Sequence, residues 1–204
     1  MCSASPVKVV AFDVDGVLVE PQFAKVLPGL LKRSAAEIAE FFGGPFEECL
    51  LGRVDLKAAL PDVLHQWQWQ GSVEQFIEFW FAVESSINHT MLAFVDHLRA
   101  SDMRCILAST QERYRARQLC ALLGVGTRFE RAFFSCDIGH QKPSPEFFAF
   151  VAHEMGLSPA QLGIIDDVAI NVESAQHLGW SGVVYRIGES VEPVVKALGL
   201  STAA

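Results

Sequence analysis

The chain has 204 residues, enough for one ordinary domain or for one domain with a modest insertion, and this length excludes large multidomain machinery. Half of the residues are hydrophobic and 20% are charged, a composition too apolar for a disordered chain. The 16 lysines and arginines against 24 aspartates and glutamates give a net charge of −8, which argues against nucleic acid or an anionic membrane as the main partner.

The first predicted element is a strand at residues 7–12 (VKVVAF), directly followed by Asp13. A short apolar run with so little polar alternation is typical of a strand that is buried on both faces of a parallel sheet. The sequence therefore predicts a buried first strand that ends at an aspartate.

Residues 18–91 carry helix signals instead of further strand runs. Ser34-Ala35-Ala36-Glu37 is a capping box before a helix that ends at glycine, and Ser72 opens another helix with one apolar face. The segment is too long for a connection and too apolar for a linker, so we expect a small helical cap domain. Its large aromatic side chains are expected mainly in the core of that domain: Trp67, Trp69, Phe76, Phe79, Trp80 and Phe81.

Strands and helices alternate over residues 92–204. Apolar runs at 104–108, 132–134, 163–165 and 182–185 predict strands, and capped segments at 113–123, 145–155 and 171–178 predict helices. This order predicts an α/β fold with a doubly wound, Rossmann-like parallel sheet. The domains are then a core at 1–17 and 92–204 and a cap at 18–91. Arg113, Arg115 and Arg117 are expected on the solvent face of their helix.

The cysteines and histidines give no sign of a metal site or a disulfide framework. The five cysteines have no C-x-x-C spacing, and no two histidines lie four residues apart. Any metal must therefore be held by carboxylates. We expect reduced thiols and a cytoplasmic protein, because the sequence also lacks an apolar stretch of membrane-spanning length and a start typical of a cleaved signal.

Polar residues follow the predicted strands and should meet at one edge of the sheet. They are Asp13 and Asp15, Ser109 and Thr110, Lys142, and the pair Asp166 and Asp167. Carboxylates gathered at one edge repel each other unless a cation binds between them, which suits Mg²⁺. A lysine and hydroxyls opposite such a metal would make a phosphate site. Each group also has a purely structural interpretation, because Asp-Gly favours turns and because serines and aspartates cap helices.

The order of these groups resembles the haloacid dehalogenase (HAD) superfamily of hydrolases. Asp13-Val14-Asp15-Gly16-Val17 after a strand, then Ser109, then Lys142-Pro143, then Asp166-Asp167 with Asn171, match its four motifs in order. The helical segment after the first motif resembles the first type of cap in that superfamily.

The resemblance implies a catalytic role for four residues. Asp13 would be the nucleophile that forms an aspartyl-phosphate, and Asp15 the general acid and then base. Ser109 would bind a phosphoryl oxygen, as would Thr110, which stands where relatives often have asparagine. Lys142 would neutralise charge on the phosphoryl group and on Asp13.

The remaining motif residues would hold the metal or support the site. The expected metal ligands are Asp13, Asp15 and Asp167, whereas Asp166 would orient Lys142 or a metal-bound water. Gly16 would let the chain turn after the first strand. Asn171 stands where many relatives carry a further carboxylate, and it is expected to be structural.

These implications favour a Mg²⁺-dependent phosphatase that acts on a small phosphorylated metabolite under a mobile cap, as a monomer or homodimer without nucleic-acid or membrane partners. A phosphotransferase or mutase would use the same residues. The non-enzymatic alternative is a metabolite-binding module of the same fold. Dehalogenation is disfavoured, because such enzymes lack an acid two residues after the nucleophile and need no Mg²⁺.

Overall fold

The computed structural model describes residues 7–200, so Cys2 and the outer ends of the predicted core domain, residues 1–6 and 201–204, lie outside the described part. A five-stranded sheet with the order β3-β2-β1-β4-β5 forms its centre, and all neighbouring strands are parallel. The strands are β1 (Val9–Phe12), β2 (Arg104–Ser109), β3 (Ala132–Phe134), β4 (Leu162–Asp166) and β5 (Ser181–Val184). The predicted α/β fold with a parallel sheet is confirmed.

The register of the three central strands brings their carboxyl ends level with one another. Phe12 at the end of β1 pairs with Leu107 of β2 on one side and with Ile165 of β4 on the other. Because β1 lies in the middle of the sheet, the residues that follow these three positions share one edge.

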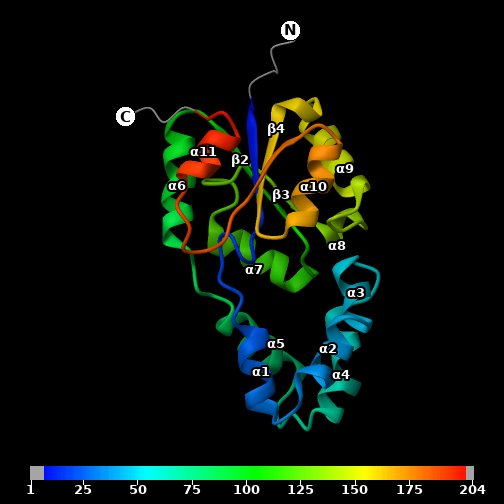
Figure 1. Ribbon diagram of the computed structural model, residues 1–204. Coiled ribbons are helices and arrows are strands. Elements are labelled where there is room, and N and C mark those ends of the chain that lie inside the picture. Colours follow the sequence, from blue (N-terminus) through cyan, green and yellow to red (C-terminus); the bar gives the residue numbers. More distant parts are fainter. Residues whose placement is uncertain (1–6, 201–204) are drawn as a thin grey trace.

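Helices cover both faces of the sheet (Figure 1). Alternate residues of β1 point into two hydrophobic cores. Val10 and Phe12 pack in the core that also contains residues of α6 (His89–Ala100), α7 (Arg113–Leu123) and α11 (Glu192–Ala197). Val9 and Ala11 pack in the other core, with residues of α9 (Pro145–Met155) and α10 (Ala169–His177). The short helix α8 (Ser135–Ile138) follows β3, and a 3₁₀ turn, η1 (Pro159–Gln161), precedes β4.

Five helices between β1 and α6 form a separate group, called the helical unit below. They are α1 (Phe23–Leu31), α2 (Ala35–Phe42), α3 (Pro45–Leu50), α4 (Leu56–Gln66) and α5 (Val73–Val83). The capping boxes at Ser34 and Ser72 are formed, so both predicted helix starts are confirmed. The unit has its own aromatic core, and it lies beyond the carboxyl edge of the sheet (Figure 1).

Two extended segments that lie side by side join the helical unit to the sheet. Glu20 donates its backbone N–H to Ser86, and Asn88 donates its own to Leu18, each at 2.8 Å. Asn88 also caps α6, which packs against the sheet from its first turns. The predicted domain boundary after residue 91 therefore falls within the first turn of α6.

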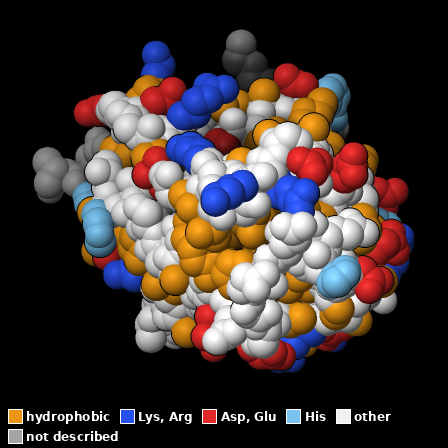
Figure 2. All heavy atoms as spheres, turned by 90° about the horizontal axis from the view of Figure 1, so that it is seen from below, with side chains coloured by type: hydrophobic (Ala, Val, Ile, Leu, Met, Phe, Trp, Pro, Cys, Tyr) orange, Lys and Arg blue, Asp and Glu red, His pale blue; other side chains and the backbone are white. Residues whose placement is uncertain are grey.

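Hydrophobic side chains gather on the face of the helical unit that points away from the sheet, beside several basic side chains (Figure 2). A hollow of about 890 Å³ lies there, between the end of α1, the connection from α4 to α5, and α5 itself. None of the helices in residues 7–200 combines the length and apolar character that a membrane span needs. Cys49, Cys105, Cys120 and Cys136 are free thiols, as expected for the described cysteines.

Candidate active site

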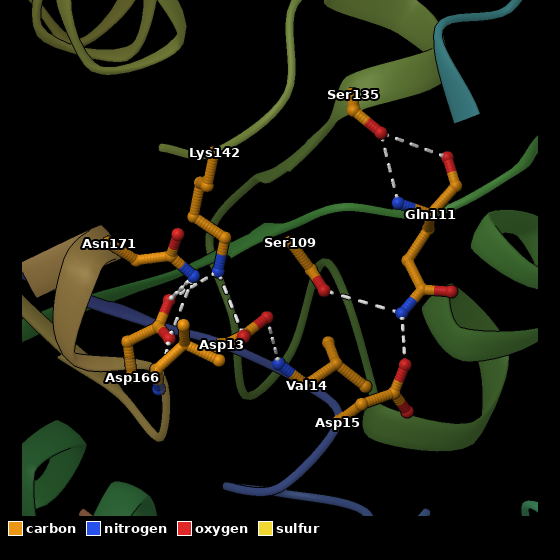
Figure 3. Close-up of polar contacts among 10 residues, drawn as sticks. Asp13, Val14, Asp15, Ser109, Gln111, Ser135, Lys142, Asp166 and Asn171 are labelled. Atoms are coloured by element: carbon orange, nitrogen blue, oxygen red, sulfur yellow. Dashed lines mark hydrogen bonds and ion pairs between the residues drawn. The ribbon is translucent and has the colours of Figure 1, made fainter. Parts of the chain in front are cut away.

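A cluster of charged residues lies at the carboxyl edge of the three central strands. Asp13 follows β1, Ser109 and Asp166 end β2 and β4, and Lys142 comes from the connection between α8 and α9. All four side chains are buried. The structure therefore brings together residues that are up to 153 positions apart in the chain, as the motif order predicted (Figure 3).

Lys142 makes ion pairs with two carboxylates. Its Nζ lies 2.9 Å from Asp13 Oδ2 and 2.5 Å from Asp166 Oδ2. Burial disfavours the ammonium form, but the two carboxylates outweigh this and hold the pKa of Lys142 above its ordinary value. Lys142 is therefore a fixed positive charge beside Asp13.

Asp166 is held in place by several hydrogen bonds besides the one from Lys142. Asn171 Nδ2 donates to both of its carboxylate oxygens, at 3.0 and 3.1 Å, and the backbone N–H of Val168 donates to Oδ1 at 2.9 Å. A carboxylate engaged in this way is well placed to orient Lys142. This arrangement agrees with the supporting roles that the motif resemblance gives to Asp166 and Asn171.

Asp13 is buried, with its carboxylate at the wall of a cavity. The backbone N–H of Val14 donates to its Oδ1 at 2.7 Å, and Oδ2 faces Lys142. Burial raises the pKa of Asp13 to about 7, although Lys142 and Ser109 act in the opposite direction. A carboxylate with such a pKa at a cavity wall is typical of a functional site.

Asp167 approaches the turn after β1 very closely. A Cβ atom on Gly16 would lie 2.2 Å from Asp167 Oδ2, and Gly16 has a φ of +79°, in the left-handed region. Only glycine allows both the turn and this approach without strain. The predicted need for a flexible residue at position 16 thus has a second, steric cause.

Three carboxylates at this edge fit a divalent cation. Oxygen atoms of Asp13, Asp166 and Asp167 all lie within 4.8 Å of one another. Carboxylate oxygens are the ligands that Mg²⁺ prefers, so the donor set suits that ion. Asp166 already accepts hydrogen bonds from Lys142, Val168 and Asn171, which makes it a weaker candidate ligand than its neighbour Asp167.

The Asp15 side chain lies apart from these three carboxylates. Its Oδ2 accepts a 2.7 Å hydrogen bond from Gln111 Nε2, and its buried Oδ1 has no hydrogen-bond partner among the described residues. Burial raises the pKa of Asp15 above its ordinary value, against the effect of Gln111. A carboxyl that is more easily protonated than usual is suited to donate a proton.

Gln111 is a site residue that the sequence reasoning missed. Besides Asp15, its amide donates to Ser109 Oγ at 3.3 Å, and its backbone N–H donates to Ser135 Oγ at 3.0 Å (Figure 3). Gln111 therefore joins the turn after β1 to the end of β2 and the start of α8. The only hint in the sequence is its place directly after Ser109-Thr110.

An open cavity of about 430 Å³ lies between the sheet edge and the helical unit. Asp13, Asp15, Ser109, Lys142 and Asp167 come from the sheet side, and the cavity wall also includes Glu47 and Leu50 of α3. Thr110 lines the cavity as well. The space is therefore bounded by one lysine, hydroxyl groups and carboxylates, as expected for a phosphoryl group with a bound cation.

The prediction that Arg115 lies on the solvent face of α7 is wrong. Its side chain is only 2% exposed, and its Nη2 donates to the backbone carbonyl of Glu84 at the end of α5. Its Nη1 donates to Gln118, and its guanidinium lies over the ring of Phe81. The helical unit covers this position, which the periodicity of α7 alone does not indicate. Arg113 and Arg117 are exposed, as predicted.

Comparisons of this chain with known proteins agree on one family. The family model of haloacid dehalogenase-like hydrolases matches residues 7–179. Among curated proteins, the bifunctional epoxide hydrolase 2 of Mus musculus is 23% identical over 223 residues, covering 94% of this chain and 39% of that protein. The chain thus spans about two fifths of the length of this relative.

Solved structures with the same fold include a HAD family enzyme from Bacteroides thetaiotaomicron in complex with magnesium and inorganic phosphate. It has a TM-score of 0.78 and 22% identity, covering 92% of this chain and 98% of that one. An L-2-haloacid dehalogenase from Xanthobacter autotrophicus with chloropropionic acid covalently bound has a TM-score of 0.63 and 18% identity, with coverages of 97% and 84%. Because the family model matches most of its length, this chain belongs to the haloacid dehalogenase-like hydrolases.

Proposed function

We propose that this protein is a Mg²⁺-dependent phosphatase that hydrolyses a small phosphate monoester through an aspartyl-phosphate on Asp13. The observation that carries the proposal is the ion pair between Lys142 and Asp13, next to a cavity that Asp15 and Ser109 also line. Lys142 would offset the repulsion between the anionic nucleophile and the anionic phosphoryl group. Support also comes from the magnesium and inorganic phosphate in the Bacteroides thetaiotaomicron enzyme.

In the first step, an oxygen of Asp13 would bond to phosphorus while the bond from phosphorus to the ester oxygen breaks. Asp15 would give its proton to that departing oxygen, so the product leaves as a neutral alcohol. Ser109, with Thr110, would donate hydrogen bonds to the non-bridging phosphoryl oxygens. The positive charge of Lys142 would remain beside both reacting groups.

In the second step, Asp15 would take a proton from water while the water oxygen bonds to phosphorus. The bond between phosphorus and Asp13 would break, releasing inorganic phosphate and returning both carboxyl groups to their starting states. Gln111 would keep the Asp15 carboxyl oriented through both proton transfers.

A cation would be held by the carboxylates of Asp13 and Asp167, on the donor set described above. When bound, Mg²⁺ supplies positive charge to the phosphoryl oxygens and holds Asp13 in its ionised form. The sequence also predicts Asp15 as a metal ligand, and the hydrogen bond from Gln111 to its side chain favours a role of that side chain in proton transfer. We further propose that the helical unit acts as the cap domain, close to the predicted division at residues 18–91.

Phosphate release from a panel of phosphate monoesters, with Mg²⁺ and with a chelator, tests this proposal. We expect metal-dependent release by the wild type, none by Asp13→Asn, and normal release by Asp137→Asn, whose aspartate is exposed on α8. Undiminished release by Asp13→Asn would overturn the assigned nucleophile.

The rival functions give different products in the same experiment. A phosphotransferase or mutase would transfer the phosphoryl group to an added alcohol rather than to water. A non-catalytic binding module would bind phosphate esters without turnover. A dehalogenase would release halide from a haloacid without Mg²⁺, and the structural likeness to the Xanthobacter autotrophicus enzyme shows only a shared fold.

A further inference from the structure

A second cavity, of about 240 Å³, lies between the helical unit and α7, and we refer to it as the aromatic pocket. Its wall contains four aromatic side chains, from α1, α2, α3 and α5: Phe23, Phe42, Phe46 and Trp80. The rings of Phe23 and Trp80 are stacked with centroids 4.7 Å apart, and those of Phe42 and Phe46 meet edge to face at 5.2 Å. The rings thus hold one another in place and present a preformed apolar wall.

The aromatic pocket joins the active-site cavity at Asp15. Asp15, Leu50 and Thr110 line both spaces. In the proposed reaction, Asp15 protonates the departing oxygen of the substrate. The carbon skeleton attached to that oxygen therefore has a direct path from Asp15 into the aromatic pocket.

The size of the aromatic pocket suits one ring with a short linker. An apolar cavity of about 150 Å³ in another protein is large enough to bind benzene. At about 240 Å³, this pocket has room for a single ring and a few further atoms. Burial of a planar ring against four aromatic side chains gives both hydrophobic and ring-stacking stabilisation.

The charges around the aromatic pocket disfavour an anionic group on the same molecule. Three carboxyl groups line it, those of Asp15, Glu84 and Glu112, against the single guanidinium of Arg115. Arg115 donates to the backbone carbonyl of Glu84 and to Gln118, which fixes its guanidinium, and its buried Nε has no hydrogen-bond partner among the described residues. Glu84 is held at the wall by a 2.9 Å hydrogen bond from Trp80 Nε1.

We propose that the aromatic pocket binds the alcohol part of the substrate, and that this part carries a planar ring and no anionic group. The inference rests on the proposed phosphatase function and adds its substrate class. The substrate is then an aryl-alkyl phosphate monoester with the phosphoryl group as its sole anionic group. Asp15 stands at the junction, where the ester oxygen lies.

Three esters with similar leaving groups test the substrate class. We expect phenethyl phosphate to have a kcat/KM about 10- to 50-fold above that of propyl phosphate, because only the former buries a ring. At pH 8, above the pKa of Glu84, we expect kcat/KM for para-carboxyphenethyl phosphate to fall at least about tenfold below that for phenethyl phosphate, because its carboxylate then meets the ionised carboxylate of Glu84. Equal kcat/KM for the three esters would overturn the inference and leave the phosphatase function standing.

Two variants connect the preference to the aromatic pocket. Phe42→Leu should lower the ratio of kcat/KM for phenethyl over propyl phosphate by about fivefold or more, because Phe42 lines the pocket. Phe79 is also a half-buried ring of the helical unit, but it does not line the aromatic pocket. Phe79→Leu should therefore leave that ratio unchanged. Glu84→Gln should reduce the penalty on the carboxylated ester severalfold. Equal effects of the two phenylalanine variants would contradict the assignment.

Binding of the product alcohol separates this inference from the proposed function. Phenethyl alcohol should bind saturably to the wild type, as followed by tryptophan fluorescence, and more weakly to Phe42→Leu than to Phe79→Leu. If no ester releases phosphate, the phosphatase function fails, and the alcohol still decides whether the aromatic pocket binds rings. Absence of saturable binding would overturn the inference.

Discussion

The side-chain amide of Gln111 donates a 2.7 Å hydrogen bond to Asp15 Oδ2, across 96 positions of sequence. The same amide group donates to Ser109 Oγ, and the Gln111 backbone N–H is held by Ser135. The orientation of Asp15 is thus fixed by a residue that is itself anchored at two further points. If Asp15 transfers protons in the reaction, Gln111 is its positioning residue.

Replacing Gln111 by leucine should lower kcat for phosphate release by about 10- to 100-fold with a much smaller change in KM, because a misoriented acid or base loses part of its usual contribution. Gln111→Glu should be at least as damaging, since it places a second carboxylate against Asp15. Steady-state kinetics measure both parameters, and circular dichroism checks that the fold is kept. Full activity of Gln111→Leu would show that the hydrogen bond has no role in the reaction.

Gly16→Ala should weaken Mg²⁺ binding by about 10- to 100-fold, because the added Cβ would displace the carboxylate of Asp167. Titration calorimetry with Mg²⁺ measures this effect directly. Gly126→Ala is the matched control, since Gly126 also has a positive φ, of +91°, with no atom within 4 Å of the added Cβ. Both variants should lose about 1 kcal/mol of unfolding free energy from backbone strain, and only Gly16→Ala should lose metal affinity.

Lys142→Met should lower the free energy of unfolding by about 3 kcal/mol, because it leaves the buried carboxylates of Asp13 and Asp166 without their cation. Urea denaturation measures the loss. Lys196→Met, at an exposed position on α11, should change stability by less than about 0.5 kcal/mol.

A double variant tests whether unpaired charge causes that loss. Adding Asp166→Asn to Lys142→Met removes one of the two stranded carboxylates and should recover part of the stability. If the double variant is less stable than Lys142→Met, lost packing rather than uncompensated charge explains the effect.

Most of the fold could be predicted from local sequence patterns. The strands are short apolar runs, and the helices start at recognisable caps such as Ser34 and Ser72. The edge on which Asp13 and Asp166 meet follows from parallel strands alone. The chemical roles given to these residues stay predictions, because their positions do not by themselves establish a reaction.

Features made by contacts between the helical unit and the sheet could not be predicted. Arg115 sits in a helix rich in polar residues, and its burial depends on Glu84, which lies 31 positions earlier in another part of the fold. The aromatic pocket likewise depends on how four rings of the helical unit face Asp15. Sequence periodicity describes one helix at a time, so it does not show which residues another unit covers.

Glu84 should make the stability of the protein depend on pH. Burial, with Asp15 nearby, raises the pKa of Glu84 from its ordinary 4.5 to about 7. Between these values the folded state keeps a proton on Glu84 that the unfolded state has lost. The free energy of unfolding therefore falls as pH rises through this window.

The glutamine in Glu84→Gln cannot titrate. Between pH 5 and pH 8, the free energy of unfolding of this variant should therefore fall by about 2 kcal/mol less than that of the wild type. This figure is below the full effect of the pKa shift, because the side chain is partly solvated. Urea denaturation of both proteins at the two pH values gives this difference. Glu78→Gln, on the exposed face of the same helix α5, should follow the wild type. Parallel losses in all three proteins would mean that the folded state holds no extra proton on Glu84.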